Sequence, residues 1–495
     1  MARFSALDPS ARDLGETTLA WADQWFDPDV SLLWNPEGAF EESPEGRQWH
    51  LVPQSAWYAL GLLMRGEGDD HERAIRIIDA VIATQYDAPG AVWDGTFARF
   101  LEWPDPPPDA RIWVDYDPNW RQFVGTTFLL VIGHVGTELP VDLVERIDRS
   151  VDRAVAGEDP ERVGPSYSNI ALMKAWLEVE HGTRSSRDDL VASGETLAAA
   201  IVERFDRNGT FEEYNSPTYY GVDLYALRLW GTRSSSASLR EWGARLESAL
   251  WDDLAAFHHA GLGNLCGPWT RSYGMDMGRY VGAVGLWMWA ALGREYTPLP
   301  SFEEPFEHGH DLLLGPAAAL LGARIPDAAA DRLVAFSGER LVERVVSSDP
   351  HRVATAWLEP GLMLGAESSD PGWSAWGQYH PATVHWRCPD GSIGWIRLRH
   401  RAPVSATVTE RALAVVCRPH PRHGPQPTTI EIHAPGASPG AIGEAMWTLP
   451  GLVAEVHTAA RPSDVTEEGD LIVVRYDPAD TDVTWRLEVV ESALG

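Results

Sequence analysis

Apolar residues recur every three to four positions through the first two thirds of the chain, in paired segments. The first member of each pair is apolar on nearly all sides, whereas the second carries Arg, Asp and Glu along one side. A helix that is apolar all round is buried, and one with a single apolar stripe lies at a surface. The pairs are 52–66 with 69–85, 118–135 with 140–156, 165–182 with 185–205, and 216–231 with 236–259. We therefore predict a ring of helical hairpins, an (α/α) toroid, closed or partly open.

The pattern changes after residue 336. Before it, the apolar segment 274–292 and the Ala-rich segment 311–335 continue in helical style. Beyond it, short segments such as VTWRLEVVE alternate or run apolar between Gly, Pro and Asp turns, which is typical of a β-sandwich. We predict an α+β multidomain protein, with a catalytic (α/α) toroid at 1–335 and an antiparallel β-sandwich domain at 336–495.

The composition narrows the class of partner. The net charge of −32 repels nucleic acid and anionic membranes, so an anionic substrate must be met by locally placed arginines. The three cysteines lack Cys-x-x-Cys spacing, which argues against a metal motif or a disulfide framework. The N-terminus lacks a signal-like apolar region and no run reaches the length of a membrane span. We predict a cytoplasmic protein with a small-molecule or carbohydrate substrate and no nucleic-acid or membrane partner; homo-oligomerisation stays open.

The stretch 207–225, RNGTFEEYNSPTYYGVDLY, concentrates polar aromatic residues around a turn and a helix start. Ser216 followed by Pro predicts that the helix begins there. Tyr219, Tyr220 and Asp223 then share one face near the helix N-terminus. Only one of two adjacent residues points straight inward, and we favour Tyr220 for proton transfer. Asp223 either orients Tyr219 or Tyr220 or bonds a loop amide. The alternative is a core tyrosine whose hydroxyl is hydrogen-bonded.

Two further segments carry candidate chemistry. Asn169, in GPSYSNIALM, lies near a predicted helix start and serves either as a cap or as a substrate-binding amide. Arg271 and Tyr273 lie in the Gly-rich segment GPWTRSYG, where Arg271 either binds an anion or forms a structural ion pair with Asp276.

The histidines and tryptophans add weaker candidates. His50 and His380 are general bases, metal ligands or structural histidines. His308-Gly-His310 has metal-ligand character, but without carboxylate partners we predict no metal there and no cofactor. Of the 23 tryptophans, three fall at predicted rims where stacking on a sugar would use them: Trp49, Trp120 and Trp269.

Four of these motifs resemble those of a known group of enzymes. Asn119-Trp120 resembles the Asn-Trp that opens an inner helix, and Asn169 occupies the place of a carboxylate-neutralising asparagine. NGTFEEYNSPTYYG resembles a segment that supplies a histidine and the catalytic tyrosine, and Arg271 resembles a catalytic-site arginine. Together with a toroid followed by a β-sandwich, these motifs resemble polysaccharide lyases of the hyaluronate/chondroitin/xanthan type and of the heparinase and alginate-lyase groups.

The resemblance implies β-elimination at a uronate. Tyr220 would remove the proton beside the carboxylate, while Asn169 and Arg271 neutralise the charge that develops. The family's histidine falls at Tyr214, where Asn215 is the nearest polar group. Arg271 or another neighbouring charge would then have to lower the pKa of Tyr220. Other predicted substrate-binding residues are Glu213, Tyr214, Asn215, Tyr219, Asp223, Asn119, Trp120, Trp269, Tyr273, His50 and His380.

Three other functions fit the same pattern. A glycoside hydrolase would use Glu212 or Glu213 with Asp94 or Asp223 as its carboxylate pair. A dehydratase or isomerase of a small alcohol would place its chemistry in the same ring. A non-catalytic sugar-binding protein would keep the aromatic cleft, and the missing histidine favours it.

Overall fold

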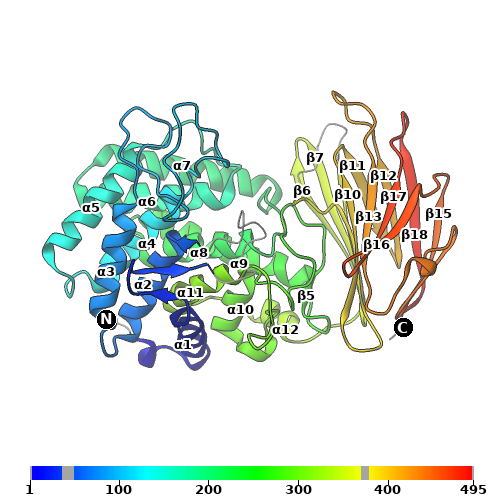
Figure 1. The fold of residues 1–495 in the computed structure, drawn as a ribbon, viewed down its shortest axis with the longest axis horizontal. Helices are drawn as coiled ribbons and strands as arrows, with labels where there is room; N and C mark the ends of the chain where they lie inside the picture. Colours follow the sequence, from blue (N-terminus) through cyan, green and yellow to red (C-terminus); the bar gives the residue numbers. More distant parts are fainter. Residues whose placement is uncertain (1–2, 36–48, 370–377, 493–495) are drawn as a thin grey trace. The chain divides into compact units, whose positions relative to one another are not determined.

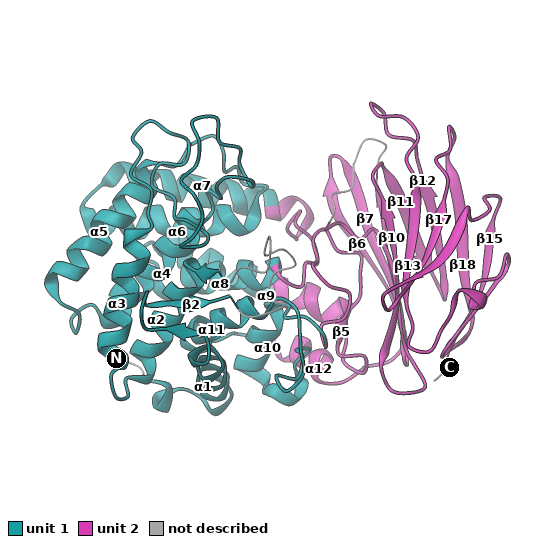
Figure 2. Cartoon of the chain, viewed as in Figure 1, with its two compact units in different colours: residues 1–204, 219–248, 279–324 teal, residues 205–218, 249–278, 325–495 magenta. Residues whose placement is uncertain are grey.

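The computed structural model describes residues 3–35, 49–369 and 378–492. Residue contacts divide the chain into two compact units (Figure 2). Unit 1 contains residues 1–204, 219–248 and 279–324; unit 2 contains residues 205–218, 249–278 and 325–495. The change of sequence pattern predicts a domain boundary between residues 335 and 336, and we retain this boundary as a proposal.

Helical hairpins build unit 1 (Figure 1). The first members are α2 (Pro53–Arg65), α4 (Trp120–Val135), α6 (Ser168–Ser185) and α8 (Tyr219–Arg233). Their partners are α3 (Asp70–Ala83), α5 (Val141–Ala156), α7 (Asp188–Asn208) and α9 (Ala237–Phe257), of which the last two continue into unit 2. Every residue of α2 before Arg65 is buried, whereas α5 buries a stripe that includes Leu143, Ile147 and Val151. The predicted difference between inner and outer helices is confirmed in these hairpins.

The inner helices close into a ring. Helices α2, α4, α6 and α8 contact one another in that order, and α11 (Gly315–Leu321) contacts both α8 and α2. Helices α1 (Pro9–Asp23) and α10 (Val284–Leu292) pack against α11. Unit 1 is therefore a helical toroid, as the paired apolar pattern predicted.

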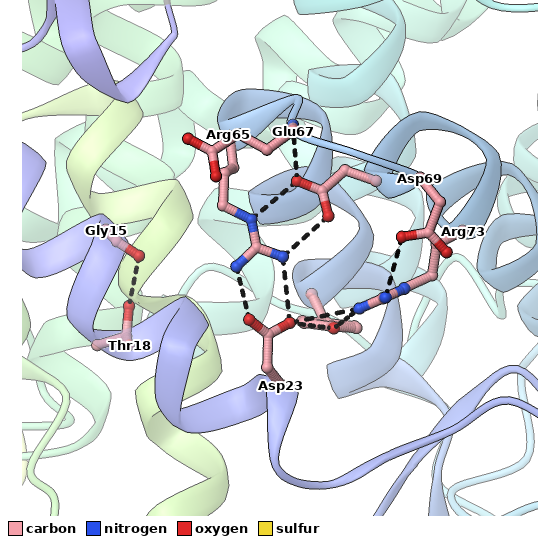
Figure 3. Close-up of polar contacts among 9 residues, drawn as sticks. Gly15, Thr18, Asp23, Arg65, Glu67, Asp69 and Arg73 are labelled. Atoms are coloured by element: carbon pink, nitrogen blue, oxygen red, sulfur yellow. Dashed lines mark hydrogen bonds and ion pairs between the residues drawn. The ribbon is translucent and has the colours of Figure 1, made fainter.

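An ion-pair network joins the ends of α1, α2 and the start of α3 (Figure 3). Arg65 Nη1 donates to Asp23 at 2.5 Å, and its Nε donates to Asp70 at 2.8 Å. The hydroxyl of Tyr58 donates to Asp23 at 2.6 Å and accepts from Arg73 at 3.1 Å. Burial and the hydrogen bond to the Asp23 carboxylate raise the pKa of Tyr58. The network fixes the first hairpin against α1.

Three predicted helix boundaries differ from the structure. The predicted helix 274–292 begins only at Val284, because the backbone around Met275 is used elsewhere: its carbonyl accepts hydrogen bonds from Asn264 and His385. The predicted start at Ser216 moves to Tyr219, since the hydroxyl of Ser216 donates to the carbonyl of Arg271 at 2.6 Å. The segment 311–335 is interrupted, forming η4 (Gly309–Leu314), α11 and α12 (Asp327–Val334).

Two antiparallel sheets form most of unit 2. The larger has the order β16 (Asp464–Glu468), β17 (Leu471–Tyr476), β13 (Thr428–His433), β10 (Ile393–His400), β9 (Ala382–Arg387), β8 (Leu362–Ser369), β7 (His351–Glu359), β6 (Arg340–Ser348). The smaller has the order β11 (Val404–Thr409), β12 (Ala412–Cys417), β18 (Val483–Ser492), β15 (Leu452–Thr458), β14 (Met446–Leu449). Leu364 and Val384 of the larger sheet share one apolar core with Val404 and Leu413 of the smaller. This is the predicted β-sandwich.

Candidate active site

The inner helices of unit 1 begin at the same end of the ring. The rings of Trp57, the fifth residue of α2, and Phe123, the fourth of α4, have centroids 6.0 Å apart. The hydroxyl of Tyr225 donates to Thr126 Oγ1 at 3.2 Å, and each is the seventh residue of its helix, α8 and α4. Residues at helix starts are thereby collected at one rim.

A polar network at this rim joins the starts of α4 and α6. Asn119 precedes α4, and its Nδ2 donates to the hydroxyl of Tyr167, which precedes α6, at 2.8 Å. Arg162 Nη1 donates to Asn119 Oδ1 at 2.8 Å. Glu158 holds Arg162 through two bonds of 2.6 and 2.7 Å and accepts from Gln122 at 2.5 Å. Both ends of the Asn119 amide are therefore fixed, so its orientation is set by the protein.

Sequence reasoning identified Asn119 but missed the residues that hold it. Glu158 and Arg162 are four residues apart and form an ion pair across the turn that follows α5, and both charges are visible in the sequence. Tyr167 stands two residues before Asn169 in the motif already singled out.

The predicted catalytic residues of unit 1 lie at the starts of neighbouring inner helices. Asn169 is the second residue of α6, and Tyr220 is the second residue of α8, which contacts α6. Asn169, Tyr220 and Asp223 are fully buried, whereas Tyr219 is partly exposed. Solvent therefore reaches Tyr219 and not Tyr220 in this conformation.

Trp120 and His50 differ in accessibility. Trp120 opens α4, is partly exposed and packs its ring against Phe123 at a centroid distance of 5.3 Å. His50 is buried between two carboxylates, with Nε2 3.1 Å from Asp27 Oδ2 and Nδ1 bonded to Glu102. Trp120 is thus partly accessible, while both ring nitrogens of His50 are engaged by protein groups.

Arg271 belongs to unit 2 and pairs with Glu213. Its Nη1 lies 3.1 Å from Glu213 Oε1, and its Nε donates to Gln378 Oε1 at 3.0 Å. The side chains of Arg271 and Glu213 are 17% and 11% exposed, so the pair is largely shielded from water. Asp276, the partner considered from sequence, accepts a 2.8 Å hydrogen bond from the backbone of Gly278.

The segment that carries Glu213 is tied to the loop that carries Arg271. Asn215 adopts a left-handed backbone with φ of 52°, which asparagine tolerates, and its Nδ2 donates to the carbonyls of Cys266 and Pro268. The backbone of Tyr214 donates to Thr270 Oγ1 at 2.9 Å, and its buried ring meets Phe257 edge-on. The amide of Asn215 therefore fixes the loop.

Trp269 and His380 are buried together in unit 2. Their backbones exchange two hydrogen bonds, of 3.1 and 2.9 Å, and their rings meet edge-on at 5.9 Å. His380 Nε2 lies 3.3 Å from the carbonyl of Ser272, and burial holds the pKa of His380 well below its usual value. His380 is thus a neutral imidazole in the interior, while the nearby Tyr273 is partly exposed.

The carboxylates considered for a hydrolase have different surroundings. Asp94 Oδ1 accepts a hydrogen bond of 2.9 Å from the backbone of Ala88 in unit 1, where Asp223 is fully buried. Glu213 is paired with Arg271 in unit 2, and its neighbour Glu212 is partly exposed.

The fold defines a protein with a helical toroid followed by an antiparallel β-sandwich. The chain belongs to the family described as "Domain of unknown function (DUF8769)", whose model matches residues 12–323. A second model, "Domain of unknown function (DUF8770)", matches residues 338–463. No curated protein matches the chain.

Similar solved structures include a chondroitin AC lyase from Streptomyces coelicolor A3, 13% identical, with a TM-score of 0.49 over 99% of this chain and 80% of that chain. An α-L-rhamnosidase from Dictyoglumus thermophilum is 10% identical, with a TM-score of 0.30 over 97% of this chain and 50% of that one. Endoglucanase CelQ from Clostridium thermocellum is 9% identical, with a TM-score of 0.29 over 93% of this chain and 74% of that chain. Among the described residues, no helix combines the length and apolar character needed to cross a bilayer.

Proposed function

We propose that the protein is a carbohydrate-active enzyme, and specifically a lyase that cleaves a uronate-containing oligosaccharide or glycoside by β-elimination. The observation that supports this function most is the arrangement at the rim of unit 1. Asn119, Asn169 and Tyr220, which match three motifs of the lyases, stand at the starts of α4, α6 and α8, three consecutive members of the ring.

Tyr220 is fully buried, so the proposed reaction requires the rim to open around it when the substrate binds. The proton beside the uronate carboxylate then moves to the phenolate of Tyr220. The electrons of that C–H bond form a C=C bond, and the bond from the neighbouring carbon to the glycosidic oxygen breaks. The leaving oxygen takes back the proton from Tyr220. General acid–base help of this kind contributes roughly 10²–10⁴-fold.

The carboxylate must be neutralised before its neighbouring proton becomes acidic. Asn169 offers an amide donor, and Arg271 keeps the role that the resemblance implies, a guanidinium that binds the carboxylate. The partly exposed ring of Trp120 supplies a face for stacking on a sugar. No step calls for a cofactor.

Tyr219 and Tyr220 provide a matched pair for the test. A panel of uronosides is incubated with the protein, and the conjugated double bond is followed by its ultraviolet absorbance. Tyr220→Phe should lower turnover by at least about 10²-fold, while Tyr219→Phe keeps most of it. Far-ultraviolet circular dichroism of both variants checks that the fold is intact. Full activity of Tyr220→Phe, or loss confined to Tyr219→Phe, would reject the assignment of Tyr220.

The same panel separates the other functions. New reducing ends without the absorbance indicate a hydrolase, and the carboxylates Glu212, Glu213, Asp94 and Asp223 then become the residues to vary. Thermal stabilisation by sugars without turnover indicates a binding protein. Turnover of a small alcohol without effect on any uronoside indicates the dehydratase or isomerase.

A further inference from the structure

Three side chains of the types that bind metal ions lie close together in unit 1. His308, His310 and Asp311 each present one ligand atom, and these atoms lie within 4.8 Å of one another. His310 Nε2 is 3.4 Å from Asp311 Oδ1, and the two imidazole rings have centroids 5.0 Å apart. The carboxylate that the His308-Gly-His310 motif was expected to lack is supplied by the very next residue.

The backbone turns sharply to bring these side chains together. His308 has a left-handed conformation, with φ of 57° and ψ of 31°, directly before η4. The backbone of Asp311 donates to the carbonyl of His308 at 3.0 Å, which closes a turn over Gly309. The turn lets residues three apart in sequence direct their side chains to a common point.

The cluster is shielded from water. His310 is buried, and the side chain of Asp311 is 13% exposed. Within the described residues, Asp311 Oδ2 is a buried oxygen that accepts no hydrogen bond. Burying a carboxylate oxygen without a hydrogen-bond donor or a cation is unfavourable, so the position is one that a bound cation would stabilise.

We infer that His308, His310 and Asp311 form a binding site for a divalent transition-metal ion of the zinc type. Around tetrahedral zinc, with bonds of about 2.0–2.1 Å, donor atoms lie about 3.3–3.4 Å apart. The 3.4 Å between His310 Nε2 and Asp311 Oδ1 already has this spacing. Three protein ligands leave a fourth position for water or for an oxygen of a small molecule.

The ligand types select the class of metal. Imidazole nitrogens suit Zn²⁺, Co²⁺ and Ni²⁺, whereas Ca²⁺ and Mg²⁺ take oxygen ligands. Arg99 also acts electrostatically on His308, and its positive charge opposes a cation at this place. Weakly held ions gain too little from one carboxylate to overcome that repulsion, while a transition metal gains two strong bonds to nitrogen.

Metal binding by the full chain, made without a histidine tag, tests the site. The protein is stripped with EDTA, loaded with Zn²⁺ or Co²⁺ and passed over a desalting column, and its metal content is measured. We expect one equivalent in the wild type, with visible absorption from bound Co²⁺. Two variants suit the fold: Asp311→Asn is nearly isosteric, and His308→Asn tolerates the left-handed backbone. Each should weaken binding at least tenfold.

His457→Asn is the matched control, because that imidazole is 58% exposed on β15 of unit 2. It should bind Zn²⁺ like the wild type. Zn²⁺ should also raise the Tm of the stripped wild type and of the control, and leave both site variants unchanged. Equal binding by the wild type and the site variants would overturn the inference, as would preference for Ca²⁺ over Zn²⁺. If a variant fails to fold, the test rests on the wild type alone. Its Tm should rise with Zn²⁺ and it should retain one equivalent of the metal; absence of both results would reject the site.

Discussion

Asn119 and Tyr167 meet through a hydrogen bond of 2.8 Å, from the side-chain amide of the first to the hydroxyl of the second. The two residues lie 48 positions apart in sequence and directly precede α4 and α6. The bond therefore holds together two helix starts that carry candidate site residues, and Arg162 fixes the other end of the same amide.

A double-mutant cycle on this pair should reveal its contribution. Asn119→Ala and Tyr167→Phe should each lower the free energy of unfolding by about 1–2 kcal/mol, since each leaves a polar group without its partner. The double variant should lose less than the sum, with a coupling of roughly 1 kcal/mol. Urea denaturation measures all four proteins. Strict additivity would show that the two groups do not interact.

Arg271 should matter for both stability and turnover. Arg271→Ala leaves the shielded carboxylate of Glu213 without this cation, so the free energy of unfolding should fall by about 1–3 kcal/mol. Gln378→Ala removes only one neutral hydrogen-bond partner and should cost about 1 kcal/mol. Turnover of a uronoside should disappear in Arg271→Ala and persist in Gln378→Ala. Equal turnover by both variants would assign Arg271 a structural role only.

Buried histidines in unit 2 should make the protein sensitive to mild acid. Burial lowers the pKa of His385 to about 4 and of His258 to about 3, so both stay neutral in the folded state. The unfolded chain takes up these protons as pH falls below about 6.5, which favours unfolding. His385 alone should remove about 3 kcal/mol between pH 6.5 and 4.

The pH effect is best measured as a difference between two proteins. Asp253, whose pKa burial raises to about 6, acts in the opposite sense because its folded form binds a proton first. His385→Gln keeps an amide donor for the carbonyl of Met275 and removes the titration. Its stability relative to the wild type should therefore rise as pH falls from 6.5 to 5. A constant difference over that range would contradict the assignment.

The ion-pair network around Arg65 should contribute more to the stability of unit 1 than an exposed ion pair does. Arg65→Ala should lower the free energy of unfolding by about 2–4 kcal/mol, because Asp70 is buried and Asp23 also loses a cation. Arg149 pairs with Glu145 at 3.9 Å on an exposed face of α5, so Arg149→Ala should change it by less than about 0.5 kcal/mol. Similar losses of unfolding free energy in both variants would mean that burial of the Arg65 network does not strengthen its ion pairs.

Local pattern was sufficient to predict the hairpins and most strands, because both depend on burial periodicity. Strand β8 lacks this periodicity: its side chains are buried on both faces, so LMLGAESS does not alternate. Strand β16 lacks the apolar pattern too, because it is a charged strand at a sheet edge, where apolar residues are not needed. In both strands the burial pattern is determined by the position of the strand in its sheet.

The candidate site was predictable only where a side chain has a motif of its own. Asn119, Asn169 and Tyr220 mark helix starts, and a helix start is encoded locally. The partners of Arg271 were not predictable, because Glu213 and Gln378 lie 58 and 107 positions away. Such pairs depend on how distant segments fold together, and their spacing in the sequence does not predict them.

Some contacts of α1 join it to helices that are synthesised much later. Trp289 on α10 donates a 2.9 Å hydrogen bond to Asp13 on α1 across 276 positions of sequence, and α1 also packs on α11. At ribosomal rates of about 5–20 residues per second, the partners of α1 follow it by roughly 14–55 s. Its buried face stays without those partners for that whole interval. Helix α1 therefore leaves the ribosome well before α10 and α11, and its contacts with these two helices form late.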